Sequence, residues 1–89
     1  MIEHVAVGPD DGGGAGDTIV LLHGIGGDCT NWQPQLDAFS GRYRCLSWTM
    51  PGYGESTPIE PMTWPALADA VVSLLDEHSV EAASLVGLS

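Results

Sequence analysis

Residues 18–27 read Thr-Ile-Val-Leu-Leu-His-Gly-Ile-Gly-Gly, an apolar run that passes directly into a glycine-rich stretch. A strand that is apolar at successive positions is typical of a parallel sheet covered on both faces, whereas a half-exposed strand alternates. Glycine after the run indicates a loop. We therefore predict a central strand over residues 18–23 that leads into a loop over residues 24–28.

The segment before this strand predicts one more strand. Residues 2–7 are rich in β-forming side chains and stop at the turn residues Gly8 and Pro9. The polar connection over residues 10–17 would suit a flexible linker if a domain preceded it. Since a single strand precedes it, we expect a hairpin loop that joins the two strands.

Downstream, helix and strand patterns alternate. Trp32, Leu36 and Phe39 recur at i, i+4 and i+7, which is one stripe of an amphipathic helix. Residues 43–48 form the next expected strand and residues 83–86 a fourth. This alternation predicts an α/β fold with a parallel sheet and right-handed crossovers. Ligands bind at the carboxyl ends of such strands, which lead here into residues 23–28, 49–56 and 87–89.

Proline positions set the expected start of each helix. Asn31 as the N-cap puts Pro34 in the first turn, whose N–H groups have no partner within the helix. Thr30 as the N-cap, in a capping box with Gln33, would place Pro34 at the fourth helical position, where its missing N–H removes one hydrogen bond of the helix. Asn31 is therefore the expected N-cap of the first helix, and Thr63, with Pro65 in the first turn, that of the second.

The second helix is expected to bury one apolar face. Asp69, Asp76 and Glu77 fall on the opposite face, where we expect a solvated acidic surface rather than paired catalytic carboxylates. His78 is expected to be packed at the edge of the apolar stripe. The stripe consists of Leu67, Ala70, Val71, Leu74, Leu75 and His78.

The composition excludes several classes of partner. Twelve Asp and Glu stand against two basic residues, Arg42 and Arg44, which gives a formal net charge of −10. Nucleic acid and anionic membrane surfaces need clustered Lys or Arg, so neither is an expected partner. The sequence shows no secretory signal after Met1 and no apolar run near the roughly 18–20 residues of a membrane span. A cytoplasmic, single-domain protein is expected for 89 residues.

Cysteine and glycine spacings indicate neither a metal nor a nucleotide cofactor. Cys29 and Cys45 are too far apart for a Cys-x-x-Cys motif and, with His23, match no zinc spacing, so free thiols are expected. The glycines over residues 24–27 could cradle a phosphate. The dinucleotide fingerprint, however, would need glycine or alanine in place of Cys29 and an acid in place of Arg44. No cofactor is expected.

Several segments together resemble the α/β-hydrolase family, from its early strands to its nucleophile elbow. They are His23-Gly24-Ile25-Gly26-Gly27, Trp32, Pro51-Gly52-Tyr53-Gly54-Glu55-Ser56 and Val86-Gly87-Leu88-Ser89, in the family's order and spacing. The resemblance covers nearly the whole chain from Thr18. It implies a mostly parallel sheet with flanking helices. The stretch from His23 to Leu36 is most similar to the enol-lactonase and ring-cleavage-product hydrolase branch.

The resemblance implies a nucleophile at Ser89, because Gly87-Leu88-Ser89 supplies the first half of the Gly-x-Ser-x-Gly turn. The backbone N–H of Ile25 would be one oxyanion-hole donor, and that of residue 90 the second. A serine favours hydrolysis of ester, lactone, thioester or carbon–carbon bonds, or cofactor-free perhydrolysis. It disfavours the dehalogenases and epoxide hydrolases that use an Asp nucleophile. A small ester or lactone is the expected substrate.

The loop around Ile25 is expected to support that donor. Gly24, Gly26 and Gly27 let backbone N–H groups reach a developing oxyanion. His23 is expected to hold the loop by side-chain hydrogen bonds rather than to act as the base. In the family the base follows the nucleophile, and every histidine in this chain precedes the elbow.

The middle motif departs from the family at Thr49, where an Asp is usual two positions before Pro51-Gly52. That Asp is structural in the family rather than catalytic. We therefore expect the hydrogen bonding of this loop, and with it the local stability of the loop, to differ from that in the family. The resemblance to the family does not depend on this residue.

Residues 1–89 are expected to be the N-terminal portion of one hydrolase domain. Larger α/β domains run to roughly 200–250 residues, and no acid or histidine of a triad follows Ser89. The piece alone is expected to be inactive on p-nitrophenyl esters and to associate through its last strand, an open edge. Two alternatives stay open: one chain of a two-chain hydrolase, or a non-catalytic interaction module derived from the fold.

Overall fold

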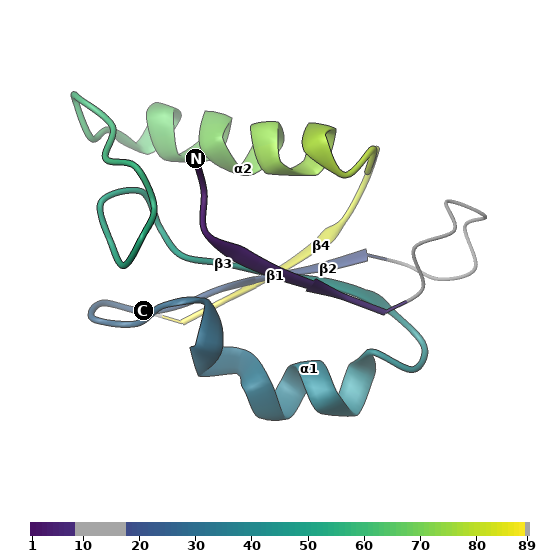
Figure 1. Ribbon diagram of the computed structural model, residues 1–89. Coiled ribbons are helices and arrows are strands. Elements are labelled where there is room, and N and C mark those ends of the chain that lie inside the picture. The colour runs from purple at the N-terminus through teal and green to yellow at the C-terminus, as the bar shows by residue number, and fades with distance from the viewer. Residues whose placement is uncertain (9–17, 89) are drawn as a thin grey trace.

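Four strands of the described chain form one sheet, with a helix against each face (Figure 1). The computed structural model describes residues 1–8 and 18–88, so the polar connection and Ser89 lie outside the described residues. In chain order the elements are β1 (His4–Val7), β2 (Thr18–Leu22), the 3₁₀-helix η1 (Cys29–Trp32), α1 (Gln33–Phe39), β3 (Arg44–Trp48), α2 (Trp64–Glu77) and β4 (Ser84–Gly87).

The sheet has the order β1-β3-β2-β4. Strand β2 is parallel to both of its neighbours, with Val20 opposite Leu46 on one side and Leu85 on the other. Strand β1 pairs antiparallel with β3. The prediction of a mostly parallel α/β sheet with flanking helices is thus confirmed, and β2 is the central strand that the apolar run predicted.

The expected hairpin between the first two strands is wrong. Strand β3 lies between β1 and β2, so β1 pairs with β3, and His4 lies opposite Trp48. The hairpin was expected because β1 and β2 follow each other in the sequence. The crossover through α1 instead returns the chain to the neighbouring position beside β2, because a parallel partner needs such a crossover. The free edge of β3 is then the place that β1 takes.

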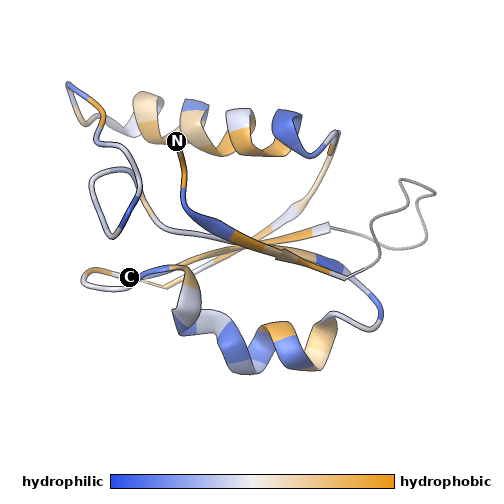
Figure 2. Ribbon diagram, in the orientation of Figure 1, coloured by the Kyte–Doolittle hydropathy of each residue, from blue (hydrophilic) through white to orange (hydrophobic). Residues whose placement is uncertain are grey.

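Each face of the sheet carries its own apolar cluster. Toward α1, Leu21 packs with Trp32, Leu36 and Cys45. Toward α2, the buried members are Trp48, Ala70 and Leu74. Figure 2 shows apolar colour along the strands and on parts of both helices. Both clusters follow from the stripes of the sequence, since period 3.6 in a helix brings those side chains to one face.

The start of the first helix differs from the prediction. The N-cap is Asp28, whose side chain accepts from the N–H of Thr30, and it caps η1 rather than α1. Asn31 is the other half of this capping box, because its Oδ1 accepts from the N–H of Asp28 at 2.7 Å. A 3₁₀ turn thus precedes the α-helix, and Pro34 still falls in the first turn of α1.

The second helix begins as predicted. Thr63 is its N-cap and accepts from the N–H of Ala66, with Pro65 in the first turn. The acidic residues Asp69, Asp76 and Glu77 are exposed, as expected. In the described ranges, neither α-helix has the length and apolar content that a bilayer span requires.

Strand β4 lies at an edge of the described sheet, and all four of its residues are exposed. Leu85 is 58% exposed and Val86 is 43% exposed. The prediction of an open edge at the last strand is confirmed for the described residues. Such an edge presents unpaired N–H and C=O groups to another chain.

Candidate active site

Three loops leave the carboxyl ends of β2, β3 and β4, and two of them meet through the backbone. Gly87 is paired with Leu22, and the N–H of Leu88 donates to the carbonyl of Leu22 at 3.1 Å. The chain therefore leaves β4 directly beside the start of the glycine-rich loop. Ser89, the predicted nucleophile, is the next residue and lies outside the described residues.

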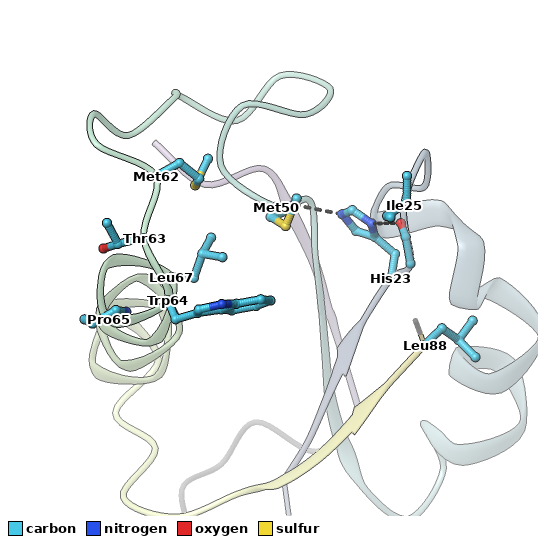
Figure 3. A pocket seen from close by; sticks show the side chains of 10 residues that line it. His23, Ile25, Met50, Met62, Thr63, Trp64, Pro65, Leu67 and Leu88 are labelled. Carbon is cyan, nitrogen blue, oxygen red and sulfur yellow. Dashed lines mark hydrogen bonds between the residues drawn. The ribbon is translucent and has the colours of Figure 1, made fainter.

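His23 connects the glycine-rich loop to the loop after β3. It is buried, its Nε2 accepts from the N–H of Met50 at 2.9 Å, and its Nδ1 donates to the carbonyl of Gly24 at 2.8 Å (Figure 3). These partners require a neutral ring that carries its proton on Nδ1. Both nitrogens are occupied, so the ring has no lone pair left to take a proton from a nucleophile. The hydrogen bonds expected of His23 are therefore present.

The glycine-rich loop turns tightly at positions that need glycine. The N–H of Gly27 donates to the carbonyl of Gly24 at 3.0 Å, and Gly26 has a φ of +83°, which glycine adopts without strain. A Cβ at Gly27 would lie 2.9 Å from Oδ1 of Asn31. The turn leaves Ile25 at its tip, where the side chain is 92% exposed. Within the described chain, the N–H of Ile25 has no hydrogen-bond partner.

Thr49 cross-links the loop after β3 from a fully buried position. Its Oγ1 accepts from the N–H of Cys29 at 2.9 Å, at the start of η1, and its N–H donates to the carbonyl of Glu3 at 2.7 Å. A threonine hydroxyl can thus hold the first turn of the helical segment that follows the glycine-rich loop. The hydrogen bonding that the sequence left in doubt at this position is well satisfied.

Ser56 closes the same loop, a role that the motif ending at this residue did not predict. Its hydroxyl donates to the carbonyl of Thr49 at 2.6 Å and accepts from the N–H of Glu3 at 2.9 Å. The side chain is 5% exposed. A small polar residue directly after the Gly-Tyr-Gly-Glu turn is the available sequence signal, but its partner on the N-terminal segment is 53 residues away.

An open cavity of about 830 Å³ lies between the glycine-rich loop and the start of α2 (Figure 3). This volume falls in the range of about 300–1,000 Å³ that small-molecule sites occupy. The described wall is mainly apolar, and none of its side chains carries a formal charge. It consists of His23, Gly24, Ile25, Met50, Met62, Thr63, Trp64, Pro65, Leu67 and Leu88.

The wall at the start of α2 was not predicted as part of a site. Trp64 is 84% exposed and Met62 is 44% exposed, and both line the cavity. The start of α2 therefore contributes a large exposed apolar surface to the cavity wall. From the sequence, Thr63 was predicted only as an N-cap and Leu67 only as a member of the apolar stripe of the helix. Their second role comes from where α2 begins relative to the ends of the strands.

Among the described residues, the carboxyl of Asp28 and the thiol of Cys45 have shifted pKa values. The hydroxyl and the N–H of Thr30 donate to Asp28 at 2.6 and 2.8 Å, and these bonds hold the pKa of the carboxyl below its ordinary value of 3.8. Burial raises the pKa of the Cys45 thiol. Cys29 and Cys45 are both buried free thiols, as expected. A buried thiol with a raised pKa is a poor nucleophile.

Sequence comparison places the chain in a family of known proteins. The sequence profile of the alpha/beta hydrolase family matches residues 19–89. Over 78 residues, the chain is 37% identical to the dihydrolipoyllysine-residue acetyltransferase component of an acetoin cleaving system from Cupriavidus necator, covering 86% of this chain and 21% of that protein. It is 35% identical to 3-oxoadipate enol-lactonase 1 of Acinetobacter baylyi, covering 80% of this chain and 27% of the enzyme.

A solved structure with the same fold is also known. The enol-lactonase of Burkholderia xenovorans superposes with a TM-score of 0.87 at 30% identity, covering 99% of this chain and 34% of that one. The chain thus spans about a third or less of the proteins it matches.

Proposed function

Because the chain belongs to the alpha/beta hydrolase family, we propose that it forms the N-terminal portion of a serine hydrolase domain. Ser89 is the nucleophile of this proposal, and a small ester or lactone is the substrate. The observation that supports this proposal most directly is the hydrogen bond from the N–H of Leu88 to the carbonyl of Leu22. It brings the end of β4, one residue before Ser89, to the start of the loop that holds His23 and Ile25.

The proposed reaction is acyl transfer to serine followed by hydrolysis. The Ser89 hydroxyl attacks the acyl carbon and gives its proton to a histidine supplied after residue 89. The N–H of Ile25 donates to the oxyanion, together with the N–H of residue 90. Collapse of the tetrahedral intermediate breaks the bond to the alkoxy group, which takes the proton. Water then releases the acid from the acyl-enzyme.

His23 has a positioning role in this proposal. Its two hydrogen bonds fix the carbonyl of Gly24 on one side and the N–H of Met50 on the other. The peptide that follows Gly24 carries the N–H of Ile25, so the ring orients the proposed donor. The buried bond from Cys29 to Thr49 holds the far end of the same loop.

The cavity supports an uncharged acyl group or lactone as the substrate. Met50, Met62 and Leu67 form apolar wall opposite Ile25 and Leu88 (Figure 3). Apolar lining with few polar groups is typical of pockets that bind small organic ligands. The likeness to proteins named enol-lactonases supports a lactone within this class.

The test is Ser89→Ala in the intact natural protein that carries these residues, assayed with p-nitrophenyl acetate and with an enol-lactone. We expect kcat/KM to fall by about 10⁴-fold or more, because the nucleophile is lost while the fold is kept. Ser84→Ala, on the exposed strand β4, is the matched control and keeps its activity. Full turnover by Ser89→Ala contradicts the proposal, as does ester hydrolysis by residues 1–89 alone.

A further inference from the structure

A second cluster of chemistry-bearing side chains lies at the other end of α2 from the cavity. His4, from β1, meets Glu77 and His78, at the end of the helix, and their ligand atoms all lie within 4.8 Å of one another. Trp64, in the cavity wall, begins the same helix, so the two regions are about 20 Å apart along it. We propose that His4, Glu77 and His78 form a binding site for a divalent transition-metal ion, with Zn²⁺ as the best match.

The two histidine rings already face each other through the nitrogens that would bind. Nε2 of His4 and Nε2 of His78 are 2.8 Å apart, and the rings are nearly perpendicular, at 89°. Two Zn–N bonds of about 2.0–2.1 Å at a tetrahedral angle place their nitrogens about 3.3–3.4 Å apart. The rings therefore need to separate by about half an ångström to accept the ion between them.

His4 has the hydrogen bonding of a metal ligand. Its Nδ1 donates to the carbonyl of Ile2 at 2.8 Å, which assigns the proton to Nδ1 and directs the Nε2 lone pair at His78. Metal-binding histidines commonly donate their other N–H to a backbone carbonyl, because the bond fixes both the tautomer and the ring orientation. The β1 side of the site is thus pre-oriented.

His78 is held from the opposite side. Arg44 donates from Nη1 to the carbonyl of His78 at 2.9 Å, and its Nη2 lies 3.4 Å from Nδ1 of the ring. The shorter bond is to the backbone, so it remains when the ring binds an ion through Nε2. The ring then carries its proton on Nδ1, so Nη2 of Arg44, which is also a donor, has to move away from Nδ1. The half-buried His78 thus contacts both His4 and Arg44, which goes beyond the packing that the apolar stripe predicted.

Glu77 supplies the oxygen ligand. A cavity of about 360 Å³ is lined by Met1, Ile2, Glu3, His4 and Glu77, so open space adjoins two of the three ligands. Two imidazoles and one carboxylate are a ligand set that Zn²⁺ accepts, with water in the remaining position. The net charge of −10 favours a cation at this surface.

Zn²⁺ affinity tests this proposal, measured on the intact natural protein by competition with a chromophoric chelator. Replacing both histidines, as His4→Gln with His78→Gln, is expected to weaken Zn²⁺ binding by at least about 100-fold. Mutating a residue that only hydrogen-bonds to a metal ligand already lowers metal affinity by about 10–100-fold. Glu77→Gln is expected to weaken it by about 10-fold or more. Asp76→Asn, on the exposed neighbour, removes the same charge and binds as the wild type does.

Two results would overturn the site. If the double histidine variant binds Zn²⁺ as tightly as the wild type, the ion is held elsewhere. If Asp76→Asn and Glu77→Gln weaken binding equally, general charge and not ligation explains the carboxylate effect. Should the variants fail to fold, imidazole ¹⁵N chemical shifts of the wild type decide. Zn²⁺ is expected to shift Nε2 of His4 and His78 while His23 stays unchanged, and unmoved Nε2 signals refute the proposal.

Discussion

The loop after β3 and strand β4 reverse the usual relation between polarity and burial. In the loop, the polar side chains of Thr49 and Ser56 are 0% and 5% exposed, whereas Leu85 and Val86 in the strand are 58% and 43% exposed. The polar residues are buried because they satisfy backbone groups of neighbouring segments. The apolar residues are exposed because no described element covers the β4 edge. Burial here follows the position of a residue among its neighbours more than its hydropathy.

Within residues 1–89, the largest loss of stability in this comparison is expected from Thr49→Val. Valine keeps the shape of the side chain but removes the oxygen that accepts from the buried N–H of Cys29. A buried donor left without a partner costs about 1–3 kcal/mol, so the free energy of unfolding falls by that amount. Urea denaturation measures it. Thr57→Val, at an exposed position, is the control, and an equal loss in both variants would contradict a special role for Thr49.

A sharper test of the exposed strand is Leu85→Ser, in residues 1–89 alone and in the intact protein. In residues 1–89 the free energy of unfolding is expected to change by less than about 0.5 kcal/mol, because Leu85 is already exposed. If further chain covers β4 in the intact protein, the loss there rises to about 1.5–3 kcal/mol. Equal small effects in both would mean that β4 stays an open edge.

The smallest expected effect concerns Asp28 at the start of η1. Hydrogen bonds from Thr30 lower the pKa of this carboxyl, so they stabilise the fold above the pKa of the unfolded chain. That contribution is lost as the pH falls through the lowered pKa of the folded state. Thr30→Val removes the hydroxyl bond and is expected to raise the pKa of Asp28 toward 3.8, as followed by NMR titration. Thr30→Ser keeps the hydroxyl, and an equal rise in that variant would contradict the assignment.

Much of the fold could be predicted because its signals are local. The apolar run at residues 18–22 indicated a strand covered on both faces, and the structure places it at the centre of the sheet. Thr63 was recognised as an N-cap from its own position before Pro65. Asn31 was wrongly predicted as the N-cap, because a 3₁₀ turn precedes the α-helix and the N-cap of that turn is Asp28, three residues earlier. Sequence spacing alone does not distinguish the two kinds of helical turn.

The candidate site was predictable where its residues adjoin in the chain. The glycine-rich loop and the hydrogen-bonding role of His23 followed from a short motif. Thr49 and Ser56 were not recognised as cross-links, because their partners lie 20 and 53 residues away. The apolar wall at Trp64 was missed for the same reason, since it depends on where α2 begins relative to the strand ends.

The sequence by itself determined the elements and the family, because hydrophobic periodicity, capping residues and glycine turns act over a few residues. Tertiary structure alone decided that β3 separates β1 from β2, and that His4 meets His78 across 74 residues of chain. The physical reason is that such contacts depend on strand order and on the path of α2 over the sheet. Those follow from how whole elements pack, which no local pattern of side chains encodes.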